Sequence, residues 1–182
     1  MKLQKQNAES PDFGKLKKMI TTLQGLLDNS TSSKLTLKAL LAFQDEDGSF
    51  KLFDTYEVPS DARVEFCHTP TYIGAAILMR ELLSGRDDLA EQLKKALNAS
   101  LHRQLEGSGY ESEEGRIEAM NIFIRGDLCS FLKTQPTLCP EFNTMIHNIL
   151  AEYDAAIKNG HTKGSWGVDY REPWQNILNK LQ

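Results

Sequence analysis

Four side chains of the kinds used in catalysis and metal binding lie close together in the first half of the chain, namely Asp61, Glu65, Cys67 and His68. Thiol, imidazole and carboxylate groups hold zinc in proteins, and they also act as nucleophiles and bases. We predict that a helix begins directly after them, and the free N–H groups and dipole of a helix start lower the pKa of a nearby thiol. The alternative is structural, with Cys67 as a small buried hydrophobic residue and His68 as its hydrogen-bonded neighbour.

Two other polar segments have similar sequences, each with an acid and a tyrosine shortly before a proline. The first contains Asp54 and Tyr56, and the second contains Asp169 and Tyr170. Carboxylate and phenol groups at the rim of a cavity can contact a ligand, so these four residues are candidate ligand-binding positions. The alternative is that they are turn residues shared by the repeats, because such polar types are common in turns.

No further motif completes a catalytic set. The acidic run that ends at Gly48 looks like the start of a calcium loop, but Tyr56 stands where such a loop needs a glutamate to bind the ion. The chain has no glycine-rich phosphate loop, no nucleophile elbow and no metalloprotease helix motif. The sequence therefore leaves open whether this protein is an enzyme.

A glycine and a serine lead into an aromatic residue at three places, which we call the glycine corners. They are Gly48-Ser49-Phe50, Gly107-Ser108-Gly109-Tyr110 and Gly164-Ser165-Trp166. The corners recur at nearly equal intervals of about 60 residues, which is the length of one helical hairpin and typical of repeat architectures.

The hydrophobic pattern between the corners predicts two kinds of helix. Each of residues 10–27, 87–101 and 140–157 has a single apolar stripe, which is typical of a helix that buries one face. Residues 69–84 and 112–132 are apolar over more than half of the helix circumference, which is typical of interior helices. Shorter helices are expected at residues 33–43 and from Pro173 onward. This alternation predicts two layers, with each corner carrying the chain from an outer helix to an inner one.

The predicted fold is therefore all-α, with three helical hairpins and a leading helix. The strand signals are weak, and the best of them is Arg63 to Phe66. Between residues 50 and 69 no helical period persists, so we expect a long connection of the kind that often carries function.

Length and composition favour a single domain. The chain has 182 residues, 40% hydrophobic and 25% charged, and we expect a flexible segment at residues 1–9 followed by one all-α repeat domain at residues 10–182. The net charge of −4 and the lack of a basic block argue against nucleic acid as a partner. The chain has no apolar run long enough to span a membrane, no recognisable secretion signal and an odd number of cysteines, so we expect a cytoplasmic protein without disulfides.

The residues around the first corner resemble a known repeat. An apolar helix end leads to Gln44, then Gly48, then Phe50, and this order resembles the repeat of terpenoid cyclases and of the β subunits of protein prenyltransferases. Gln104 repeats the pattern before the second corner, whereas His161 replaces glutamine before the third. The resemblance implies an α/α toroid in which the glutamine and the aromatic residue brace helix ends.

A chain of this length has room for about half of such a ring. The resemblance therefore implies a partial toroid, either an open arc or a half ring that a homodimer completes.

The same resemblance extends to a metal site. Glu65 and Cys67 resemble the acid-x-cysteine zinc pair of the prenyltransferase β subunits, with glutamate in place of aspartate, and His161 would supply a third ligand. Zinc is then the implied cofactor, and Arg63 is a candidate contact for a diphosphate. The aspartate-rich acid motif of squalene-type cyclases is absent from the chain.

Two functions follow as expectations, beside a third in which the chain is a subunit that works by assembly and contributes its arc to a larger ring. The first is a non-catalytic module, without a required cofactor, that binds an apolar small molecule or a partner segment on the concave side formed by its inner helices. The alternative is a zinc-dependent prenyltransferase- or cyclase-like enzyme that acts on an isoprenoid-type substrate. The candidate ligand-binding positions are Asp54, Tyr56, Arg63, His68, Asp169 and Tyr170, and the candidate metal ligands are Glu65, Cys67 and His161.

Overall fold

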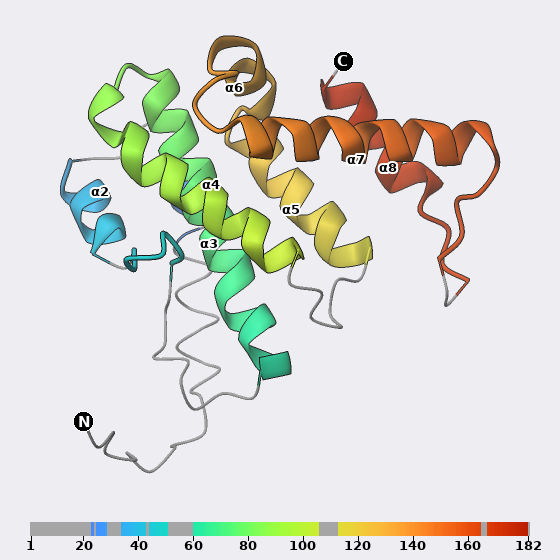
Figure 1. Cartoon of the computed structure of the whole chain (residues 1–182), viewed down its shortest axis with the longest axis horizontal. Helices are drawn as coiled ribbons and strands as arrows, with labels where there is room; N and C mark the ends of the chain where they lie inside the picture. The colour runs from blue at the N-terminus through green and yellow to red at the C-terminus, as the bar shows by residue number, and fades with distance from the viewer. Residues whose placement is uncertain are drawn as a thin grey trace.

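The computed structural model describes residues 23, 25–28, 34–42, 44–50, 60–105, 113–164 and 167–181, and for residues 34–36, 39, 60–68 and 102–105 it describes the backbone alone. The elements are α2 (Lys34–Leu41), α3 (Ser60–Leu83), η2 (Asp87–Leu89), α4 (Ala90–Leu105), α5 (Glu113–Arg125), α6 (Leu128–Thr134), α7 (Pro140–Lys158) and α8 (Arg171–Leu181). This described part contains helices and two isolated β-bridges but no strand, which confirms the all-α class (Figure 1). None of its helices is long and apolar enough to cross a membrane.

Helix α3 is the centre of the molecule and contacts α4, α5 and α6. Every residue from Thr71 to Met79 is buried, so this stretch has no face open to solvent. The nearly continuous apolar sequence of these turns leaves no polar face to turn toward water, and the prediction of an interior helix here is confirmed. Two glycines permit the close packing: a Cβ on Gly74 would lie 2.4 Å from the Phe50 ring, and one on Gly126 would lie 2.6 Å from the carbonyl oxygen of Ala76.

Helix α3 begins earlier than the sequence suggested. The expected long connection is wrong over residues 60–69, and the weak strand signal at Arg63 to Phe66 is wrong, because these residues are helical and Pro70 lies inside the helix. Residues 51–59 lie outside the described residues. Ser60 and Asp61 are favourable residues for a helix start. Pro70 costs roughly 3 kcal/mol inside a helix, and the burial of the following turns in the core outweighs that cost.

The interior helix expected at residues 112–132 is two helices. Helix α5 ends at Arg125, and α6 starts at Leu128 in a new direction. Asp127 between them has a left-handed φ of 66°, and its carboxylate accepts a hydrogen bond from the backbone N–H of Ser130 at 3.3 Å. The break was invisible in the pattern because Phe131 and Leu128 are buried after the break, so apolar residues recur across it at helical spacing.

The alternation of outer and inner helices holds only in part. Helix α4 buries Leu93 and Leu97 on one side, and α7 buries Phe142, Ile146 and Tyr153 on one side, as expected. Helix α8 follows the third corner, where an inner helix was expected, yet it buries only one face, formed by Trp174, Ile177 and Leu178. The toroidal arrangement itself stays a prediction, and the proposed flexible segment at residues 1–9 lies outside the described residues.

Candidate functional site

The first glycine corner forms a tight hairpin between α2 and α3, which we call the first hairpin (residues 44–50). The N–H of Asp45 donates to the carbonyl of Ser49 at 2.8 Å, and the N–H of Gly48 donates to the carbonyl of Asp45 at 2.9 Å. Gly48 has a φ of +90°, a left-handed conformation that favours glycine. The carboxylate of Asp47 accepts a hydrogen bond from the N–H of Ser49 at 2.9 Å and fixes the turn from inside.

The first hairpin is docked on helix α4. The side-chain amide of Gln44 donates to the carbonyl oxygen of Gln92 at 2.8 Å and to that of Gly48 at 3.2 Å. Gly48 lies so close to α4 that a Cβ on it would be 2.3 Å from the carbonyl carbon and oxygen of Lys95. Gln44 thus joins the hairpin to the first turn of α4.

The other end of the first hairpin is anchored on α3. Phe50 is 1% exposed, and its ring covers Gly74. The backbone N–H of Phe50 donates to the hydroxyl oxygen of Thr71 at 3.0 Å. The hairpin is therefore held by α3 and α4, the two α-helices that follow it in the chain.

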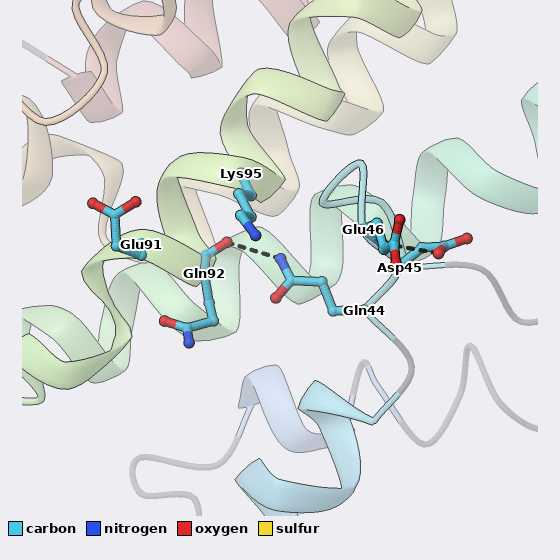
Figure 2. Close-up of a pocket in the computed structure, with 6 residues that line it drawn as sticks. All are labelled: Gln44, Asp45, Glu46, Glu91, Gln92 and Lys95. Carbon is cyan, nitrogen blue, oxygen red and sulfur yellow. Dashed lines mark hydrogen bonds between the residues drawn. The ribbon is translucent and has the colours of Figure 1, made fainter.

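A pocket of about 250 Å³ lies between the first hairpin and α4. Figure 2 shows Asp45 and Glu46 on the hairpin side, Glu91 on the helix side, and Gln44 between them. Its lining residues, which define what we call the acidic pocket, are Gln44, Asp45, Glu46, Glu91, Gln92 and Lys95.

The acidic pocket carries three carboxylates and one ammonium group. Glu46 and Glu91 are exposed, and neither forms an ion pair with another described residue. The side-chain oxygen of Gln92 is shielded from solvent and has no hydrogen-bond partner within the part of the chain that the structure describes. These acceptors favour a cationic group.

The third glycine corner forms the same hairpin in a shifted register. Gly164 N–H donates to the carbonyl of Val168 at 3.0 Å, and Gly167 N–H donates to the carbonyl of Gly164 at 2.9 Å. The left-handed glycine is therefore Gly167, with a φ of +77°, and it corresponds to Gly48. The equivalence of Gly48 with Gly164 that the sequence suggested is wrong by three residues. We call this the second hairpin (residues 163–169), of which the structure describes 163, 164 and 167–169.

Tyr170, a predicted ligand contact, points into the protein. It is 6% exposed, its hydroxyl donates to the carboxylate of Glu114, and its ring stacks on Trp174 with centroids 5.7 Å apart. The hydrogen bond with the Glu114 carboxylate is the main cause that raises the pKa of Tyr170 to about 12. The indole N–H of Trp174 donates to Glu113 at 2.9 Å, so two neighbouring acids of α5 hold α8 in place.

Tyr153 completes this aromatic group from helix α7. Its ring stacks on Trp174 with centroids 5.0 Å apart and planes 14° apart. Burial raises the pKa of Tyr153, and the neighbouring Glu113 carboxylate adds to the shift. Stacking and hydrogen bonding thus join the start of α5, the middle of α7 and the start of α8, which is a structural arrangement.

Asp169 fits the turn interpretation. It is exposed, and its carboxylate accepts a hydrogen bond from the backbone N–H of Arg171 at 3.0 Å. This hydrogen bond is the main cause that lowers the pKa of Asp169, with a further contribution from the side chain of Thr162. Asp54 and Tyr56 lie outside the described residues.

The predicted metal ligands occupy two separate elements. Glu65 and Cys67 lie in the first turns of α3, as do Arg63 and His68. Residues two apart do not share a face of a helix, so the helical register separates positions 65 and 67. His161 is exposed just after α7, where its N–H donates to the carbonyl of Ala156.

The zinc site itself stays a prediction. Within the described residues no group of three or more His, Cys, Asp or Glu is placed to hold a metal ion, and the side chains of Glu65 and Cys67 are not among them.

Nothing significant matches this chain among protein-family models, curated proteins or solved structures.

Sequence reasoning missed one side of the acidic pocket and one acid near α3. Asp45 and Glu46 were visible as an acidic run, but Glu91 gave no signal because it stands about 45 residues away on a separate helix.

Glu118 of α5 accepts a hydrogen bond from Thr69 of α3, and removal of water from its carboxylate raises its pKa. A single glutamate on an amphipathic helix looks like any other surface residue in the sequence.

Proposed function

We propose that this protein is a non-catalytic binding module, and that its acidic pocket receives a basic group of a partner segment. The observation that carries the proposal is that Glu46 from the first hairpin and Glu91 from α4 both line one pocket. Glu46 and Glu91 are exposed there and form no ion pair with another described residue, so a lysine or arginine side chain would supply a charge that pairs with them.

The walls of the pocket are held in place before any partner arrives. The hydrogen bond from Gln44 to the carbonyl of Gln92 ties one wall to the other, and Gly48 fixes the hairpin against the backbone of Lys95. A preformed site loses less conformational entropy when it binds. This supports recognition of a defined group in preference to a general attraction of positive charge.

The affinity of the pocket alone should be modest. Exposed ion pairs contribute about 1 kcal/mol or less each, so a single basic side chain would bind weakly and a longer segment would add contacts around it. The central turns of α3 offer no open surface, since residues 71–79 are buried. A partner segment at the acidic pocket is therefore favoured over an apolar small molecule on the inner helices.

The test is a titration followed by the backbone amide NMR signals. The probe is a short peptide with blocked ends and one lysine, and the comparison peptide carries norleucine, which has a similar apolar chain without the charge. We expect saturable shifts at residues 44–48 and 91–95 with the lysine peptide and none with the norleucine peptide.

A pair of matched variants makes the result specific. Replacing both Glu46 and Glu91 with glutamine should abolish the shifts, whereas Glu172→Gln removes an exposed acid from α8 and should leave them unchanged. Equal responses to both peptides, or shifts that survive the double replacement, would show that the acidic pocket is not the binding site.

A further inference from the structure

The two hairpins share a backbone conformation but differ in burial. Each is closed by an antiparallel bridge, Gln44 with Phe50 in the first and Lys163 with Asp169 in the second, and each has a left-handed glycine in the same place. Residues 48–50 of the first hairpin are buried, whereas the equivalent residues 167–169 of the second are exposed. The structure thus contains one docked hairpin and one undocked hairpin of the same kind.

The exposed residues of the second hairpin include an apolar one. Val168 is 45% exposed, and within the described part of the chain it is the exposed large hydrophobic residue. A Cβ on Gly167 would have no other atom within 4 Å, in contrast to Gly48, whose Cβ would meet the backbone of α4. The second hairpin has the same backbone as the hairpin that packs on α4, but no helix among the described residues packs against its Gly167.

We propose that the second hairpin of one copy docks at the acidic pocket of another copy, with Lys163 as the basic group that enters the pocket. This rests on the proposed function and names its partner. Lys163 is exposed and forms no ion pair within 4.0 Å with the described residues. The Asp169 carboxylate attracts Lys163 at longer range, and its hydrogen bond from the N–H of Arg171 holds it in its own turn. The docking would also cover Val168, whose exposure is otherwise unfavourable.

The contact has to join two molecules. Figure 1 shows the second hairpin projecting beyond α7 and α8 at one end of the molecule, and the first hairpin between α2 and α3 at the other end. Because a hairpin on one surface binds a pocket on a different surface, the association is heterologous, and it gives closed rings or open chains according to the rotation between copies.

The test is sedimentation velocity over about a hundredfold range of protein concentration. We expect concentration-dependent association of the natural chain that weakens at high salt, because the contact pairs exposed charges. Lys163→Glu should weaken association at least about tenfold, and so should the pair Glu46→Lys and Glu91→Lys. Lys180→Glu makes the same charge change on an exposed position of α8 and should have no effect.

A charge-swap mixture supplies the decisive result. A chain with Lys163→Glu and a chain with Glu46→Lys and Glu91→Lys should each associate poorly alone and associate with each other when mixed, since the acidic hairpin then meets the basic pocket. A natural chain that stays monomeric at every concentration, or a mixture that stays dissociated, would overturn this inference. Neither outcome changes the expected binding of the lysine peptide to the acidic pocket. Failure of self-association can therefore be told apart from failure of the proposed function.

Discussion

The side-chain amide of Gln44 lies 2.8 Å from the carbonyl oxygen of Gln92 and donates a hydrogen bond to it. Together with the packing of Gly48 on the backbone of Lys95, this hydrogen bond joins the first hairpin to α4, and Figure 2 shows it between the acids of the hairpin and Glu91 of the helix. Residues that are distant in the sequence are brought together there.

Gln44→Ala should lower the free energy of unfolding by about 1 kcal/mol, the typical net contribution of one hydrogen bond. It should also lower the affinity for the lysine peptide, because the first hairpin, which forms one wall of the pocket, is then less firmly held. Urea unfolding and the NMR titration measure the two effects. Gln175→Ala on the exposed face of α8 is the matched control, and equal effects of both replacements on peptide binding would contradict the bracing role of Gln44.

The two left-handed glycines should respond differently to the same replacement. Gly48→Ala places a methyl group 2.3 Å from the backbone of Lys95 and strains a φ of +90°, so we expect a loss of roughly 3 kcal/mol in the free energy of unfolding. Gly167→Ala has open space around it and should cost about 1 kcal/mol, from the left-handed backbone alone. Urea unfolding of both variants checks the difference, and similar losses would mean that the first hairpin is not packed on α4.

Alkaline pH should weaken the contact between α8 and α5. The pKa of Tyr170 is raised to about 12 in the folded protein, above the ordinary value of about 10. The protonated phenol is thus the form that the fold stabilises, so its contribution is complete below pH 10 and is lost as the pH rises toward 12. Urea unfolding measured between these limits should show a steeper loss of stability in the natural chain than in Tyr170→Phe, and parallel curves would argue against the Tyr170–Glu114 hydrogen bond.

Metal content separates the binding module from the zinc-dependent alternative. For a non-catalytic module we expect well under one zinc per chain after purification without chelators, and an unchanged melting temperature after a chelator is added. Elemental analysis and thermal unfolding provide both readouts. One zinc per chain that disappears in Cys67→Ser would favour the enzyme, whereas zinc that persists in that variant would point to other ligands.

The local spacing of apolar residues and glycines in the sequence predicted much of the fold. Apolar residues repeat at helical spacing on one side of α4 and α7 and on all sides of α3 from Tyr72 to Met79, and burial follows that pattern because apolar surface is driven out of water wherever the chain places it. A glycine marked the left-handed position of the first hairpin, Gly48, since a left-handed turn excludes most other residues. These features depend on neighbours in the sequence, so the sequence alone determined them.

Tertiary structure decided the rest. Packing of α3 kept Pro70 inside a helix, contact with Ala76 accompanied the break after Gly126, and the second hairpin closed on Gly167 instead of Gly164. The acidic pocket exists only because the first hairpin and α4 meet, which puts Glu46 and Glu91 on opposite sides of one pocket. Tyr170 turned inward because Glu114 and Trp174 offered partners there. Such contacts join residues far apart along the chain, and no local periodicity records which distant surfaces will meet.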